Sequence, residues 1–262
     1  MFGIVQIILW IYTRRSKLSN MSTYTKIVFI ILTIQLLNTL FIMIIFSTSY
    51  VVQSLGDSMA RSFVFSVLVF IAVVTALLIA FVKEISDSFP LNVITLLIYT
   101  ITLATAIEIL EILVDMNAKL GAFGISLTLF TSALLIGAAI KTRLADYLMA
   151  TVLLLIITAI LIAVASIVIT IFKHPSAAII FYILTDILLF AITIFVSQIT
   201  VGKLQLRIFC TEYTLAALLL YNMFSATYLT TTGMICNITN TCTSANESNH
   251  SSSNLPRYIV LM

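Results

Sequence analysis

The chain has 262 residues, of which 61% are hydrophobic and only 9% are charged. A soluble domain of this length cannot bury so much apolar surface, so the composition excludes a soluble globular protein and indicates a membrane protein with several spans. The net charge is only +3 and the basic residues are scattered, which argues against a nucleic-acid partner. The lipid bilayer is the partner that the composition predicts.

The first apolar stretch, residues 1–12, is too short to cross a bilayer. Arg14, Arg15 and Lys17 follow it, whereas the positive charges of a secretory signal precede its apolar region. We interpret residues 1–24 as a cytosolic or interfacial segment. Met21 is an alternative translation start that would remove most of this segment.

Seven apolar segments follow, separated by short polar breaks. Short connections make consecutive helices antiparallel neighbours. We therefore expect an all-α membrane protein with one bundle of seven transmembrane helices over residues 25–232 and the sixth helix at its centre. The segments are approximately Ile27–Val51, Ser62–Val82, Leu91–Val114, Gly121–Ile140, Tyr147–Phe172, Ala177–Val201 and Ile208–Thr232.

The sixth segment carries a single ionisable residue, Asp186, near its middle. A carboxylate at that depth costs a few kcal/mol unless it is paired, protonated or hydrated. We expect Asp186 to face protein or water, where it would belong to an ion pathway. The alternative is a protonated Asp186 that bonds a neighbouring Ser or Thr and holds two helices together.

The distribution of Lys and Arg predicts the orientation. With a cytosolic N-terminus, nine of the 13 basic residues lie on the cytosolic side and four on the other, as the positive-inside rule requires. Seven spans then place the polar tail, residues 233–262, in the lumen or outside the cell. This arrangement suits a multi-pass protein of the ER, the Golgi or the plasma membrane.

The tail supports this orientation because it carries three glycosylation sequons, at Asn237, Asn246 and Asn249. In an oxidising compartment, Cys236 and Cys242 would form a small disulfide loop. The alternative is two unpaired thiols, because loop closure needs a suitable geometry.

Two further carboxylates, Glu108 and Glu111, lie near the outer end of the third segment. Their i, i+3 spacing puts them on one helix face, where two carboxylates repel each other. One interpretation joins them with Asp186 in a proton- or cation-responsive vestibule that opens outward. The other has both side chains reaching the outer headgroup region.

Motifs for chemistry are absent from the sequence. It contains no H-E-x-x-H, G-x-S-x-G or P-loop pattern, and no cysteine or histidine spacing typical of a metal site. We therefore expect no enzyme, no cofactor and no metal centre.

An ordered set of short motifs resembles the transmembrane Bax-inhibitor-motif family, and in particular its Lifeguard branch, over about residues 25–232. The motifs are Ile31-Leu32-Thr33-Ile34-Gln35-Leu36-Leu37, Phe89-Pro90-Leu91-Asn92, Lys141-Thr142-Arg143-Leu144-Ala145-Asp146-Tyr147, and Ser197-Gln198 followed by Gly202. The resemblance implies a seven-helix bundle with a central sixth helix, linked to pH-sensitive calcium leak and to suppression of cell death.

The family's leak is attributed to two aspartates, and the matching positions here are Val196 and Met223. The resemblance therefore implies the fold without the two-aspartate calcium latch. The chain is also similar to seven-span proteins of cytomegaloviruses, which diverge at these aspartates and act on trafficking of host surface proteins.

Three functions follow as hypotheses. The first is a regulator of cell survival or of host membrane-protein trafficking that has host membrane proteins as partners. The second is a pH-responsive leak channel for calcium ions. The third is a seven-helix receptor, which lacks support because the D-R-Y and N-P-x-x-Y motifs are absent and the charge bias predicts the opposite orientation.

Overall fold

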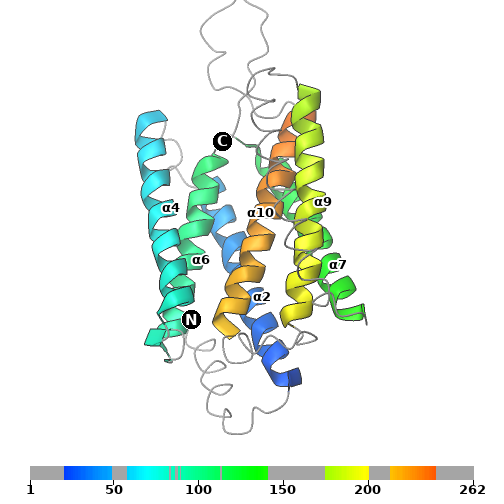
Figure 1. Ribbon diagram of the computed structural model, residues 1–262. Coiled ribbons are helices and arrows are strands. Elements are labelled where there is room, and N and C mark those ends of the chain that lie inside the picture. The colour runs from blue at the N-terminus through cyan, green and yellow to red at the C-terminus, as the bar shows by residue number, and fades with distance from the viewer. Residues whose placement is uncertain are drawn as a thin grey trace, which may run out of the picture.

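The computed structural model describes residues 21–48, 58–140 except 83, 86–87, 89 and 113, and residues 175–200 and 213–239. Over these ranges the chain forms helices and no strand, which confirms the all-α fold class (Figure 1). The helices are α2 (Met21–Thr48), α4 (Ser58–Phe81), α6 (Leu91–Leu110), α7 (Met116–Ala139), α9 (Pro175–Thr200) and α10 (Tyr213–Thr239). All except α10 are long and apolar enough to cross a bilayer, which indicates an integral membrane protein.

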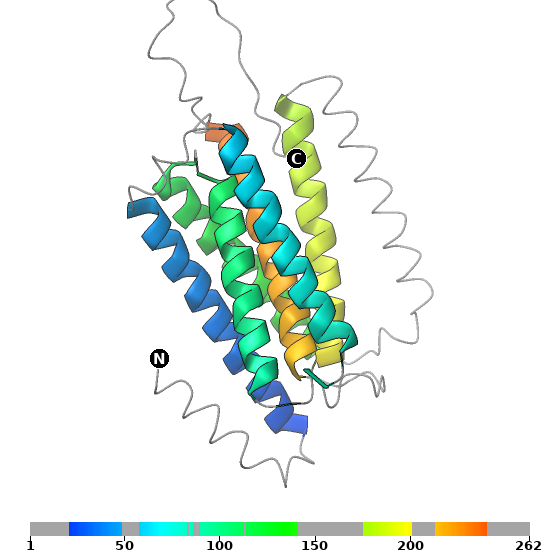
Figure 2. The same cartoon turned by 90° about the vertical axis from the view of Figure 1, so that its left-hand side faces the viewer.

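The helices form an elongated bundle in which α2, α4, α6 and α7 alternate in direction (Figures 1 and 2). In contrast, α7 and α9 both run from the top to the bottom of Figure 1. Residues 140–174 therefore connect opposite ends of the bundle. The predicted fifth segment, Tyr147–Phe172, lies outside the described residues, so the count of seven helices stays a prediction.

Several helix ends differ from the sequence prediction, and two of these differences change where polar residues lie. Helix α7 begins at Met116 rather than Gly121, which places Lys119 in a helix instead of a loop. Helix α10 extends to Thr239 rather than ending at Thr232. Hydropathy ends a segment at its polar residues, whereas a helix continues where those residues find partners within the protein.

The central helix is α10, which contacts each of the other described helices, whereas α9 packs mainly against α10 and α7. The expectation that the sixth segment is central is therefore wrong within the described part of the chain. Helix α10 buries three large aromatic side chains completely, those of Tyr221, Phe224 and Tyr228. A central helix meets protein on most sides, so it can carry polar residues that lipid would not tolerate.

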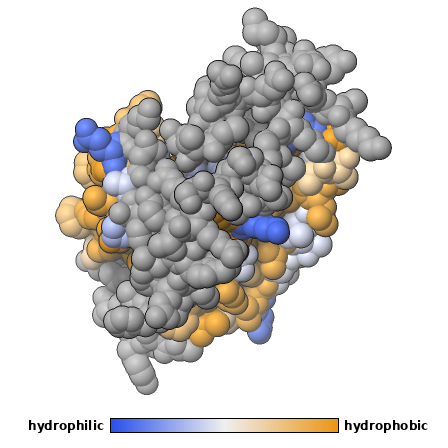
Figure 3. Space-filling view, turned by 90° about the horizontal axis from the view of Figure 1, so that it is seen from below, coloured by the Kyte–Doolittle hydropathy of each residue, from blue (hydrophilic) through white to orange (hydrophobic). Residues whose placement is uncertain are grey.

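Hydrogen bonds from α10 to its neighbours show how these polar residues are accommodated. The Thr39 and Tyr221 hydroxyls lie 2.7 Å apart and join α2 to α10, and the Tyr99 hydroxyl donates to Asn222 Oδ1 and joins α6 to α10. Helix α4, by contrast, is the most apolar and the least buried of the five apolar helices. Where described residues reach the surface in Figure 3, most are hydrophobic. The bundle thus has a polar axis and an apolar outer surface.

Candidate functional site

A buried ion pair lies at the end of the bundle where α6 joins α7. Lys119 Nζ is 2.8 Å from Glu108 Oε2, and the two side chains are 5% and 1% exposed. Glu108 belongs to the last turn of α6 and Lys119 to the first turn of α7, so the pair closes the hairpin between these helices. The sequence does not predict this pair, because the predicted fourth segment begins at Gly121 and leaves Lys119 in a loop.

Glu111 lies just beyond the membrane-spanning part of α6 and is 1% exposed. The Tyr228 hydroxyl donates a 2.8 Å hydrogen bond to Glu111 Oε2, while Oε1 has no hydrogen-bond partner among the residues that the structure describes. Glu108 and Glu111 are both buried, so the interpretation in which they reach the headgroups is wrong.

The burial of Glu111 raises the pKa of its carboxyl from 4.5 to about 8. The hydrogen bond from Tyr228 opposes this rise in pKa, the nearby Glu108 carboxylate adds to it, and Lys119 and Thr232 oppose it. The carboxyl of Glu111 is therefore easier to protonate than that of an exposed glutamate.

The aromatic packing of Tyr228 fixes the position of its hydroxyl. Its ring is stacked against that of Phe224, with centroids 6.5 Å apart, and meets Phe123 edge-on at 6.1 Å. The hydroxyl also lies 3.6 Å from Met43 Sδ on α2. Tyr228 thus connects Glu111 to the central helix through a ring that has little freedom to move.

A cavity of about 230 Å³ lies beside the ion pair. Its polar lining consists of Glu108, Lys119 and the exposed Asp115, and the rest is apolar. A polar cavity of this size can hold several water molecules, and water is a route for protons. The cluster of Glu108, Glu111, Lys119 and Tyr228, called the carboxylate cluster below, therefore combines buried charge with a polar cavity.

Asp186 does not join the carboxylate cluster. It lies on α9, and the Thr230 hydroxyl of α10 donates to its Oδ1. Tyr228 and Thr230 are two residues apart, or about 200° around the helix, so Asp186 and Glu111 contact opposite sides of α10. The expected vestibule of three carboxylates is therefore not formed, and the bond to Thr230 is the contact expected of a helix-packing role.

The positions that match the family aspartates lie in apolar surroundings. Val196 is buried in the hydrophobic core, and Met223 packs against that core. The neighbouring Ser197 hydroxyl donates to Leu134 O at 2.9 Å, which joins α9 to α7. A Cβ atom on Gly137 would lie only 2.6 Å from Ile194 O, so these two helices approach too closely for a side chain at that position.

The tail predictions fall partly within the described residues. Asn237 belongs to α10, and its Nδ2 donates to Gly233 O at 2.8 Å. Cys236 takes part in a disulfide, so the alternative of an unpaired thiol is wrong for this residue. Cys242, Asn246 and Asn249 lie outside the described residues.

No protein-family model matches the chain, and no curated protein is detectably similar to it. Over the described residues, no group of three or more His, Cys, Asp or Glu side chains could hold a metal ion. Within the carboxylate cluster, the structure shows one buried ion pair and one hydrogen bond from a tyrosine to a carboxylate.

Proposed function

We propose that this chain is a diverged membrane bundle of the Bax-inhibitor type that regulates cell survival or the trafficking of host membrane proteins without conducting calcium. The observation that carries this proposal is that three carboxylates, two of them buried and one half-buried, are each bonded to another helix. Glu108 bonds Lys119 of α7, Glu111 bonds Tyr228 of α10, and Asp186 bonds Thr230 of α10. Such cross-links favour one closed arrangement of the bundle.

The side chains at the latch positions also support a non-conducting bundle. Val196 and Met223 cannot ionise, so they cannot form a carboxylate pair that shares a proton and opens when it is lost. Val196 is instead part of the hydrophobic core, and apolar packing does not respond to pH. The inner end of the bundle would then stay closed at every physiological pH.

We further propose seven spans, a cytosolic N-terminus and a lumenal or extracellular C-terminus. Residues 140–174 link opposite ends of the bundle, which supports one more span in that range. The disulfide at Cys236 supports an oxidising compartment at the C-terminal end of α10.

Calcium flux in reconstituted liposomes tests the non-conducting part of the proposal. We expect the wild-type protein to leak no more calcium than empty liposomes between about pH 5 and 8, the window in which a latch of raised carboxylate pKa would titrate. The double variant Val196→Asp with Met223→Asp should gain a pH-dependent leak, and each single variant should only lose stability. A steep calcium leak of the wild type near neutral pH would contradict the proposal, and Asp186 would then be the first residue to substitute.

The regulatory part needs a cellular measurement. Cells that express the protein should lose a defined set of host proteins from their surface, or should survive an apoptotic stimulus better than cells with empty vector. Expression without either effect would contradict the proposed regulatory role.

A second candidate function is a pH-responsive cation leak, and one observation favours it. Glu111 Oε1 has no partner among the described residues, and the neighbouring Glu108 lines a polar cavity. If this site conducts, the double variant Glu108→Gln with Glu111→Gln should abolish the pH dependence of the flux.

A further inference from the structure

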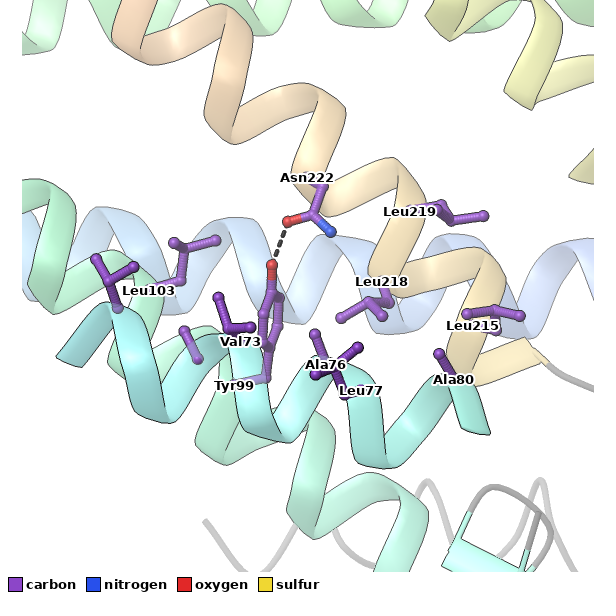
Figure 4. A pocket seen from close by; sticks show the side chains of 12 residues that line it. Val73, Ala76, Leu77, Ala80, Tyr99, Leu103, Leu215, Leu218, Leu219 and Asn222 are labelled. Atoms are coloured by element: carbon purple, nitrogen blue, oxygen red, sulfur yellow. Dashed lines mark hydrogen bonds between the residues drawn. The ribbon is translucent and has the colours of Figure 1, made fainter. Parts of the chain in front are cut away.

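A second cavity, of about 400 Å³, lies between α4 and α10 and is called the α4–α10 groove below. Tyr99 and Leu103 of α6 line it between the two helices (Figure 4). Its volume lies within the range of roughly 300–1,000 Å³ that is usual for ligand sites. It lies beside the C-terminal half of α4 and the first third of α10, and no residue of the carboxylate cluster lines it.

The two walls of the groove have the spacing of helix-packing surfaces. On α4, Ala72, Ala76 and Ala80 recur every four residues and leave room beside that helix. On α10, Leu219 and Asn222 lie on one face. Small residues on one helix and a ridge on the next are the features that let another transmembrane helix pack closely.

The α4 side of the groove is open to the surroundings. Val73 and Leu77, which line it, are 50% and 49% exposed, although most of α10 is buried. The groove is therefore a surface of the bundle, where the central helix is accessible from the membrane.

Asn222 gives the groove its chemistry. It lines the cavity together with Val73 and Ala76, which lie inside the apolar span Met59–Phe81 of α4, and so it lies within the apolar layer. Its Oδ1 accepts a hydrogen bond from Tyr99, and Figure 4 shows the amide group at the cavity. Over the described residues, no acceptor is bonded to its Nδ2.

The Asn222 Nδ2 donor indicates what kind of molecule the groove binds. A primary amide has two N–H donors, and leaving them without acceptors in an apolar layer is unfavourable. A lipid acyl chain has no acceptor at this depth. A transmembrane helix can offer one through a Gln, Asn, Ser or Thr side chain.

We propose that the α4–α10 groove binds a transmembrane helix of a partner membrane protein, and that a polar side chain of that helix accepts a hydrogen bond from Asn222 Nδ2. This inference rests on the proposed function, because it supplies the surface by which a trafficking regulator selects a membrane protein. It places recognition inside the bilayer rather than in the tail.

The test uses two synthetic transmembrane peptides of Leu and Ala that differ at one position. One peptide carries Gln at the depth of Asn222 and the other carries Leu. Each peptide and the full-length protein carry fluorophores, and energy transfer is measured in phosphatidylcholine vesicles. We expect the Gln peptide to bind roughly three- to twentyfold more tightly than the Leu peptide, the range measured for hydrogen bonds between membrane helices.

Matched variants separate the groove from the rest of the bundle. Asn222→Leu should abolish the preference for the Gln peptide, whereas Tyr99→Phe removes the internal hydrogen bond and should keep it. Val73→Trp narrows the groove and should weaken the binding of both peptides. Its neighbour Val74 is exposed but does not line the cavity, so Val74→Trp is the control and should have no effect.

Several outcomes would overturn the inference. Equal binding of both peptides to the wild type would show that Asn222 does not select the partner helix. Equal effects of the two tryptophan variants would show that the peptides do not bind in the groove. Labelling of the groove by a photoactivatable phospholipid that the Gln peptide does not displace would assign it to lipid. Energy transfer between two copies that Val73→Trp abolishes would assign it to a homodimer. Calcium flux from the wild type would contradict the proposed function alone and leave the peptide result standing.

Discussion

Removal of the positive charge of Lys119 tests whether the buried ion pair holds α6 and α7 together. In Lys119→Met, the Glu108 carboxylate keeps a side-chain exposure of about 1% but loses the ammonium group that is 2.8 Å away. Breaking one side of a buried pair typically costs about 3–5 kcal/mol because an uncompensated charge remains. We expect a loss of that size in the free energy of unfolding.

The paired substitution separates the interaction from the loss of a side chain. The double variant Glu108→Gln with Lys119→Met removes both charges and keeps similar shapes, so it should unfold within about 1 kcal/mol of the wild type. The coupling energy from the double-mutant cycle should therefore be at least about 2 kcal/mol, well above the error of additivity. Asp115→Asn is the control, because this exposed carboxylate lines the same cavity and should change stability by less than about 0.5 kcal/mol.

The assay is reversible unfolding in mixed micelles of a mild detergent and dodecyl sulfate, followed by far-UV circular dichroism. The reasoning fails if Lys119→Met unfolds within about 0.5 kcal/mol of the wild type, which is the usual effect of a surface substitution. It also fails if the double variant is as unstable as Lys119→Met alone, since the cost would then come from lost packing.

Three further predictions concern Glu111, Gly137 and Asn237. The raised pKa of Glu111 means that the folded state binds a proton that the unfolded state releases. The free energy of unfolding should therefore fall by at most about 1.4 kcal/mol per pH unit as the pH rises from 5 to 8. The Glu111→Gln variant should lose this pH dependence when unfolding is measured across the same range. Gly137→Ala should destabilise the protein by about 1–3 kcal/mol because the new Cβ meets α9, whereas Gly124→Ala on the same helix meets no atom within 4 Å and should be neutral or stabilising in the same unfolding assay. Asn237 should stay unglycosylated because sequons are used in surface loops and its amide is bonded within α10, so glycan mapping that finds sugar there would contradict the helix end.

The sequence alone determined the class of the protein and most of its helices. Transfer of apolar residues to lipid depends on composition and length, which can be read from any window of about 20 residues. For this reason Asp186 could also be assigned to the interior of a membrane helix. Its bond to Thr230 shows that it faces protein, as expected for a carboxylate at that depth.

Only the tertiary structure decided which helix is central and which carboxylates belong together. Hydropathy reports how apolar a helix is, and the most apolar helix, α4, turned out to face outward while the more polar α10 occupies the centre. Likewise, Glu108 and Lys119 lie on different helices and yet form an ion pair. Asp186 and Glu111 bond opposite sides of α10 and do not meet. Which side chains pair depends on how each helix is rotated about its axis and packed against its neighbours. The spacing of residues along the sequence does not predict that rotation.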